Sequence, residues 1–362
     1  MNNYQSSMKQ YLWTTSFCLV VSLLFVSSGF TQSTTQSPVA PRATQNTTGA
    51  AVTRKPQRQN RQSEKRANKK NAVEQTEFDE KRAFGYMKKV CDIGPRVSAS
   101  KGMWKQQEFI KKHFTELGGA VYFQHFKVRN PANNSQATLA NTIVRFQPER
   151  TKRVLICCHY DTRPFPDQDP TNPRGTFIGA NDGGSGVGLL CELGNHMKSL
   201  EGKFGVDLVF FDGEEFVYVH RRDPMFLGST FFSQQYAAGK FKGRYRYGVL
   251  VDMVADKNLE IHYEGNSLGY APRLTRHLWS VAGELGVTEF KKTERHKIRD
   301  DHLPLNQIAK IPTCDIIDFD FPVTGNSYWH TEKDIVENCS AESLGKVGRV
   351  VLEWLRQTSN HK

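Results

Sequence analysis

Histidine and carboxylate residues follow the apolar runs of this sequence at positions where they could meet. Apolar runs at 153–158, 206–211 and 247–251 are each followed directly by such residues. A glycine-rich segment at 179–186 contains a further carboxylate, and the apolar run at 313–319 precedes a loop with a further histidine. In chain order, the candidate metal ligands are His159, Asp182, Glu215, Asp252 and His330. Imidazole and carboxylate groups are donors that zinc accepts, so the pattern predicts metal-dependent chemistry.

The number of candidate ligands leaves two kinds of metal site open. Three ligands form a catalytic zinc site with one free position. Five can hold two ions if one carboxylate bridges them. Glu214, beside Glu215, is an additional acid suited to proton transfer. Asp161, two residues after His159, is a candidate acceptor for the ring N–H of that histidine.

The elements that must position these residues alternate between helices and apolar strands. Helical spacing of apolar residues predicts helices at 76–92, 104–117, 185–200, 271–285 and 341–357. Strands are predicted at 121–128, 141–146, 153–160, 206–213, 247–254 and 313–319. This order predicts an α/β fold with a mostly parallel central sheet and helices on both faces. Ligands bind beyond the carboxyl ends of such strands, so we expect the zinc site at that edge. Adjacent strand residues Cys157 and Cys158 should face opposite sides of the sheet.

Short motifs containing these residues also carry a family resemblance. In chain order they are HYD (159–161), GANDGGSG (179–186), FFDGEE (210–215), VDM (251–253) and WHT (329–331). Their order and spacing resemble those of the zinc-dependent aminopeptidases, a family that includes the glutaminyl cyclases. The resemblance covers essentially all of residues 76–362.

The resemblance implies a role for each candidate residue. It implies that Asp182 is the central or bridging ligand and that Glu215 and His330 complete a first zinc site. It also implies that His159 and Asp252 complete a second site where a second ion is present. Glu214 would be the general acid/base.

Two enzyme activities are consistent with this resemblance. Asp300 and His302 belong to a DDHLP segment (300–304) that resembles glutaminyl cyclases, as does Trp329 before His330. By that likeness Asp300 and Asp252 share a proton and hold the substrate amide, His302 neighbours Asp300, and Trp329 lines the pocket. The reaction would convert N-terminal glutamine of a peptide to pyroglutamate and release ammonia.

The alternative is an aminopeptidase with two zinc ions, because all five ligands are present. The segment after Glu215, FVYVHRRDP (216–224), has no tryptophan, and Asp315 stands where animal cyclases have a histidine. A third hypothesis is a peptide-binding module that has lost its metal. Loss of Glu214 or of a ligand would mark such a protein, and none is missing.

The N-terminal part of the 362-residue chain has a different composition. Residues 1–30 have the plan of a secretory signal peptide, with an uncleaved membrane anchor as the alternative. Residues 31–75 contain nine Lys or Arg residues and the acids Glu64 and Glu74, which predicts a disordered basic linker. The signal-like segment predicts an exported protein. Because the linker accounts for much of the net charge of +12 and the remaining domain is close to charge balance, we predict no binding of nucleic acid. Contact between the linker and an anionic cell envelope remains open. The catalytic domain is expected at 76–362.

Overall fold

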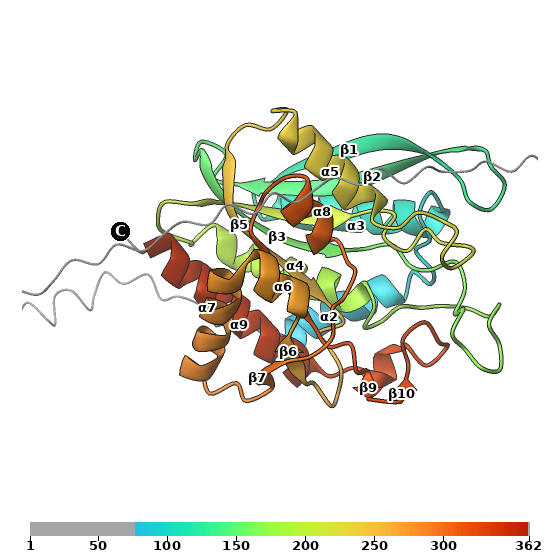
Figure 1. The fold of residues 1–362 in the computed structure, drawn as a ribbon. Coiled ribbons are helices and arrows are strands. Elements are labelled where there is room, and N and C mark those ends of the chain that lie inside the picture. The colour runs from blue at the N-terminus through green and yellow to red at the C-terminus, as the bar shows by residue number, and fades with distance from the viewer. Residues whose placement is uncertain (1–76, 361–362) are drawn as a thin grey trace, which may run out of the picture. The chain divides into compact units, whose positions relative to one another are not determined.

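A six-stranded sheet forms the centre of the described part of the chain (Figure 1). Its strand order is β1-β2-β4-β3-β5-β8. The computed structural model describes residues 77–360. The predicted signal peptide (1–30) and basic linker (31–75) lie outside the described residues. The strands of the sheet are β1 (Ala120–Arg129), β2 (Gln136–Phe146), β3 (Lys152–His159), β4 (Gly205–Phe211), β5 (Arg244–Asp252) and β8 (Thr313–Ile317).

Strand direction in this sheet is mostly parallel, as the sequence predicts. The four strands β4, β3, β5 and β8 pair in parallel. Only β2 runs the other way, because it pairs antiparallel with both β1 and β4. The four parallel strands therefore end at one edge of the sheet, where ligands bind in open α/β sheets.

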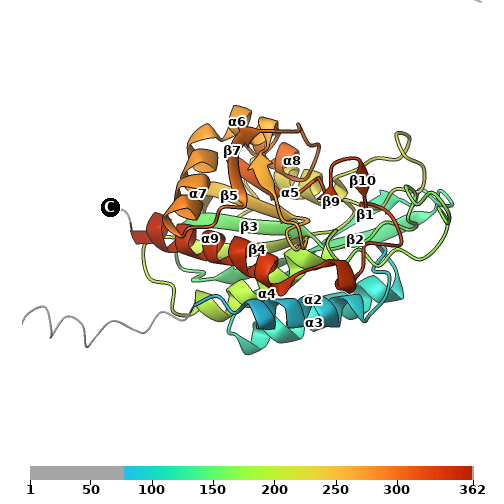
Figure 2. The same ribbon diagram turned by 90° about the horizontal axis from the view of Figure 1, so that it is seen from below.

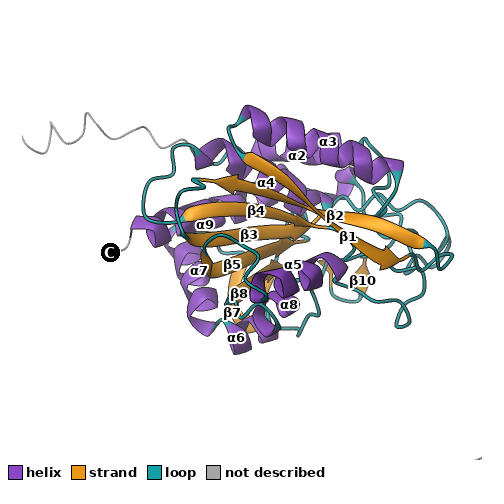
Figure 3. Ribbon diagram, turned by 90° about the horizontal axis from the view of Figure 1, so that it is seen from above, coloured by secondary structure: helices purple, strands orange, loops and turns teal. Residues whose placement is uncertain are grey.

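Helices cover both faces of the sheet (Figures 2 and 3). One hydrophobic core joins the sheet to α2, α3, α4, α7 and α9, and a second joins the opposite face to α5 and α8. Cys158 lies in the first core and Cys157 in the second, which confirms that they face opposite sides. The helices are α2 (Glu80–Cys91), α3 (Lys101–Glu116), α4 (Gly184–Met197), α5 (Leu227–Ala237), α6 (Gly265–Tyr270), α7 (Pro272–Glu284), α8 (His302–Gln307) and α9 (Ala341–Asn360).

Smaller elements complete the described residues. Two short ladders pair β6 (Ile261–Tyr263) with β7 (Phe290–Glu294), and β9 (Pro322–Val323) with β10 (Asn326–Ser327). A 3₁₀ turn, η1 (Val336–Asn338), precedes α9. None of the helices within residues 77–360 combines the length and hydrophobicity needed to cross a bilayer.

Capping side chains set the first residues of the two N-terminal helices. Asp79 accepts a hydrogen bond from the Arg82 N–H at 3.0 Å, so α2 begins at Glu80 and not at the predicted residue 76. Ser100 accepts one from the Met103 N–H at 3.2 Å, so α3 begins three residues before the predicted 104. Both are N-caps of the kind that satisfy free N–H groups in the first helical turn.

Candidate metal centre

The predicted ligands converge at the carboxyl edge of the parallel strands. His159 is the last residue of β3 and Asp252 the last of β5. Glu215 follows β4, Asp182 precedes α4, and His330 lies in the loop after β10. Their donor atoms form two groups that could each hold an ion, and both groups include Asp182.

Distances between the donor atoms give Asp182 the central position. The Nε2 atom of His159 lies 3.1 Å from Oδ1 of Asp182 and 3.1 Å from Oδ1 of Asp252. The other Asp182 oxygen, Oδ2, lies 3.4 Å from Nε2 of His330, which is 3.1 Å from Oε1 of Glu215. Each oxygen of Asp182 therefore faces a different group, as a bridging carboxylate requires.

These donors fit zinc. Zinc bonds of about 2.0–2.1 Å at tetrahedral angles place neighbouring donors roughly 3.3 Å apart, close to the separations here. The Oδ2 atom of Asp182 is buried and has no hydrogen-bond partner among the described residues. A buried polar atom without a partner is costly unless something else binds it, and a cation would do so.

The GANDGGSG segment forms the turn that carries Asp182 into the site. Gly183 adopts φ +79°, and a Cβ there would lie 3.0 Å from the His159 ring, so only glycine fits. Asn181 accepts a hydrogen bond from the Ala255 N–H at 2.8 Å, which ties the turn to the segment after Asp252. The Asp334 carboxylate accepts bonds from the N–H groups of Asn181 and Asp182 at 2.7 and 3.1 Å.

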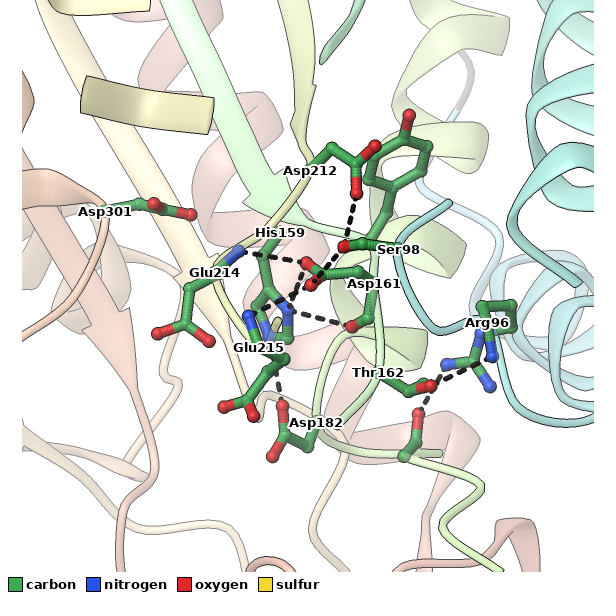
Figure 4. A network of polar contacts seen from close by, with 12 residues as sticks. Arg96, Ser98, His159, Asp161, Thr162, Asp182, Asp212, Glu214, Glu215 and Asp301 are labelled. Carbon is green, nitrogen blue, oxygen red and sulfur yellow. Dashed lines mark hydrogen bonds and ion pairs between the residues drawn. The ribbon is translucent and has the colours of Figure 1, made fainter. Parts of the chain in front are cut away.

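Asp161 contacts both His159 and the glutamate pair, through different atoms. The ring Nδ1 of His159 lies 3.2 Å from the backbone carbonyl of Asp161 but 3.9 Å from its carboxylate, so the carbonyl is the acceptor. The carboxylate instead accepts the N–H groups of Glu214 and Glu215 at 3.2 and 3.0 Å (Figure 4). Asp161 therefore orients the glutamate pair as well as the histidine.

Ser98 links Asp161 to a second buried carboxyl group, Asp212 (Figure 4). Its hydroxyl lies 2.9 Å from Asp161 Oδ2 and 2.7 Å from Asp212 Oδ1. Burial and the charge of Asp161 raise the pKa of Asp212 to about 8, so Asp212 carries a proton at neutral pH. Asp212 can then donate to Ser98 while Ser98 donates to Asp161, and all three groups are satisfied.

The adjacent glutamates differ in charge state. Burial and the charge of Glu215 raise the pKa of Glu214 well above its usual range. Burial also acts to raise the pKa of Glu215, but Arg163 and His330 outweigh it and hold that pKa well below the usual range. One carboxylate thus stays ionised as a ligand, while its neighbour can carry a proton.

Two further carboxyl groups, those of Asp300 and Asp301, interact electrostatically with Asp252. Asp300 is buried, and its Oδ2 has no hydrogen-bond partner among the described residues. Its burial, and to a lesser extent the negative charge of Asp252, raises the pKa of Asp300 well above its usual range. Asp301 is held by the Ser229 hydroxyl at 2.5 Å.

His302 is fully buried between two carboxylates. Its Nε2 lies 3.3 Å from Oε2 of Glu264, and its Nδ1 lies 3.5 Å from Oδ2 of Asp315. Donor atoms of Asp300, His302 and Asp315 also lie close together. The predicted nearness of His302 to Asp300 is therefore present.

Trp329 and His330 form a stacked pair at the rim of the site. Their ring centroids are 3.7 Å apart with an interplanar angle of 25°, and Trp329 is half-buried. His330 has φ +55°, a left-handed conformation that is uncommon for residues other than glycine. Such backbone strain often accompanies functional positions, where the surroundings fix a side chain in one direction.

Sequence reasoning missed three residues that hold the ligands in place: Arg163, Asp167 and Asp334. Arg163 contacts Glu215, Asp167 contacts His330, and Asp334 holds the turn of Asp182. Arg163 and Asp167 follow His159 within eight residues, so the rule that selected Asp161 could have selected them too. Asp334 lies four residues after His330, but its contact is with the turn of Asp182, 152 residues earlier in the chain, and the sequence spacing does not signal that contact.

Comparison with known proteins identifies the family. The sequence matches peptidase family M28 over residues 141–355. This chain belongs to peptidase family M28. Its resemblance to zinc aminopeptidases and glutaminyl cyclases is thereby confirmed. The M28 proteins to which it is similar include enzymes of both kinds, glutaminyl cyclases and zinc-dependent exopeptidases.

Several M28 structures are similar to nearly the whole described part of the chain. The Fimbriiglobus ruber glutaminyl cyclase is 38% identical with a TM-score of 0.74, covering 79% of this chain and 98% of that one. A leucine aminopeptidase precursor from Bacteroides thetaiotaomicron is 31% identical with a TM-score of 0.73, covering 80% and 100%. The glutaminyl-peptide cyclotransferase of Bothrops jararaca is 24% identical over 298 residues, which cover 72% of this chain and 77% of that protein.

Proposed function

We propose that this M28 protein is a zinc-dependent glutaminyl-peptide cyclotransferase, which converts N-terminal glutamine to pyroglutamate and releases ammonia. The observation that carries the proposal is Asp300, a buried carboxyl group that has an unpartnered oxygen and interacts electrostatically with Asp252. Such a group can bind an amide nitrogen that enters the site. A hydrolase with a metal-activated water does not require this additional acid. The 38% identity with a glutaminyl cyclase supports the same choice.

We assign the metal to the residues that share Asp182. Asp182, Glu215 and His330 would hold one zinc ion, and His159 and Asp252 would complete a second site where a second ion binds. Zinc, when bound, would polarise the side-chain carbonyl of the substrate glutamine. Similar structures described as zinc-dependent exopeptidases support this choice of metal.

The remaining steps would involve the substrate's own amine and side chains of the protein. The substrate's own α-amine attacks its side-chain carbonyl carbon, so a C–N bond forms to the α-nitrogen and the bond to the amide nitrogen breaks. Glu214 would take the proton from the attacking amine and deliver it to the departing ammonia. Asp300, together with Asp252, would hold the amide nitrogen, and the Trp329 ring would line the pocket. Because nucleophile and electrophile belong to one molecule, orientation supplies much of the rate.

The second candidate function is that of an aminopeptidase with two zinc ions. The observation that favours it is the presence of both donor groups around Asp182, which could hold a pair of ions. The structural likeness to a leucine aminopeptidase precursor points the same way.

One experiment separates the two activities. The zinc-loaded protein is incubated with a peptide that begins with glutamine, and the products are identified by mass spectrometry. A cyclase yields ammonia and a pyroglutamyl peptide that keeps all its residues. An aminopeptidase yields free glutamine and a peptide one residue shorter, and that result would refute the proposal. If metal analysis finds no bound zinc and neither product forms, a peptide-binding module that has lost its metal is the better description.

We also propose that the protein is exported, with a signal peptide at 1–30, a basic linker at 31–75 and the catalytic domain at 76–362. N-terminal sequencing of the protein recovered from the cell envelope or medium tests this. A new N-terminus near residue 30 is expected, and an intact Met1 in cytoplasmic protein would contradict it.

A further inference from the structure

A buried arginine contacts one of the candidate ligands. Arg163 lies four residues after the end of β3 and its side chain is only 1% exposed. Its Nη1 donates to Oε2 of Glu215 at 2.5 Å, and its Nε donates to Oδ1 of Asp167 at 3.2 Å. The same Asp167 oxygen lies 3.1 Å from Nδ1 of His330. One arginine and one aspartate therefore reach two of the three ligands in the Asp182–Glu215–His330 group.

These contacts leave one donor atom of each ligand facing the group. With Oε2 bound to Arg163, Glu215 presents Oε1, which lies 3.1 Å from Nε2 of His330. With Nδ1 beside Asp167, His330 presents Nε2. Partners of this kind fix the tautomer of a histidine and the orientation of a carboxylate that bind metal.

Charge alone does not explain an arginine at this position. Among residues 77–360, Arg163 is the only Lys or Arg that forms an ion pair with any of the five candidate ligands. A fixed positive charge next to a cation site repels the cation. The planar guanidinium, however, can donate to two carboxylates at once in a fixed geometry, which a lysine ammonium cannot reproduce. Orientation is thus the contribution that its geometry favours.

We propose that Arg163 and Asp167 form a clamp that holds Glu215 as a one-oxygen zinc ligand and His330 as an Nε2 ligand. Arg163 is a positioning residue, because it acts through Glu215 and Asp167 and not on the substrate. This inference rests on the proposed zinc centre, and it adds the residues that set how tightly and in which geometry the metal is held.

The test measures metal binding without reference to activity. Full-length wild-type protein is compared with Arg163→Met, Arg163→Lys and Asp167→Asn. Zinc affinity is measured by competition with a chromophoric chelator, and coordination geometry by the visible absorption of the Co²⁺-loaded protein. We expect Arg163→Met to weaken zinc binding about 10- to 100-fold. We also expect weaker cobalt absorption, because the freed Glu215 can bind with both oxygens and raise the coordination number. Arg163→Lys keeps the positive charge but loses the planar guanidinium, so its zinc affinity should lie between those of wild type and Arg163→Met.

The matched control is Arg82→Met, which removes another arginine from a buried glutamate. Arg82 lies 2.6 Å from Oε2 of Glu192, outside the ligand group. Its loss should leave zinc affinity and the cobalt spectrum unchanged, even if the protein becomes less stable.

The outcomes separate this inference from the proposed function. If wild-type protein binds no zinc, the metal centre itself is wrong. If wild type binds zinc and Arg163→Met keeps the same affinity and cobalt spectrum, only the clamp is wrong. Should Arg163→Met fail to fold, Arg163→Lys and Asp167→Asn decide, and wild-type behaviour in both overturns the clamp.

Discussion

Buried charged groups lie near both ends of strand β3, but they differ in how fully their hydrogen-bonding capacity is used. At its start, Arg153 donates to the Asp207 carboxylate and to four backbone carbonyl groups. Asp207 also accepts from Arg145 at 2.9 Å and from the Tyr245 hydroxyl at 2.5 Å. At the other end, by contrast, Asp182 and Asp300 each keep a buried oxygen with no hydrogen-bond partner among the described residues.

This difference teaches how a buried charge with a structural role can be told from one with a functional role. The Arg153–Asp207 network is nearly saturated with hydrogen bonds, so it needs nothing from outside and fixes the fold. The ligand group leaves bonding capacity unused, which suits a metal ion and a substrate. Residues 153 and 159 are about 20 Å apart along the strand, so the two ends should respond to mutation independently.

At the end of β3 that carries the ligand group, Glu214→Gln should have the largest effect on activity. Glutamine keeps the shape of the side chain but cannot carry the proton, so we expect kcat to fall about 10²- to 10⁴-fold. Bound zinc and the unfolding midpoint should stay as in wild type, since the ligands are untouched. Steady-state kinetics with metal analysis checks this, and a variant that retains wild-type kcat would remove Glu214 from the mechanism.

At the start of β3, in the Arg153–Asp207 network, Asp207→Asn should have the largest effect on stability. It leaves two guanidinium groups without their counter-charge, and breaking such a buried pair costs about 3–5 kcal/mol. The free energy of unfolding, measured in urea, should fall by that amount, while the folded fraction binds zinc normally. A large loss of zinc affinity in folded protein would show that the two ends are coupled.

Zinc removal should destabilise the protein by a smaller amount. A ligand present at a hundredfold its Kd stabilises the folded state by about 2.7 kcal/mol. Chelation should therefore abolish activity and lower the unfolding midpoint, and added zinc should restore both. The same decrease in stability is expected for Asp207→Asn protein, because the two ends act independently. An identical midpoint with and without zinc would argue against a site at this edge.

Trp329→Ala should have the smallest effect of the series. The ring stacks on His330 and is half-buried at the rim, and aromatic contacts of this kind contribute about 0.5–1.5 kcal/mol. We expect KM to rise roughly 2- to 10-fold with little change in bound zinc. Trp104→Ala on α3, where the ring is 62% exposed, is the control and should change neither. Equal effects of the two substitutions would exclude a pocket role for Trp329.

The convergence of the candidate ligands at one edge of the sheet could be predicted from the sequence because its signal is largely local. Three of the four parallel strands carry a candidate ligand at or just after their carboxyl end, as with His159 at the end of β3, and parallel strands bring such residues together. The direction of β2 could not be predicted, because an apolar run has the same pattern in both directions. Helix α5 was missed because its sequence, LGSTFFSQQYA, has little amphipathic contrast and a left-handed residue, Phe226, before it.

The residues that support the ligands were harder to predict than the ligands. Asp334 and Ser98 act through contacts across more than sixty positions in the chain, to Asp182 and Asp161. Such contacts depend on the packed fold and leave no periodic or spacing signal in the sequence. The sequence shows that Asp161 lies close to His159, but only the folded chain brings the Glu214 and Glu215 N–H groups to its carboxylate.

The most direct test of this account is anomalous X-ray diffraction from zinc-loaded crystals, measured on both sides of the zinc absorption edge. We predict a zinc-specific peak between Asp182, Glu215 and His330, at the carboxyl edge of the parallel strands. A well-ordered site with no peak there, or with zinc bound only elsewhere on the protein, would contradict the account.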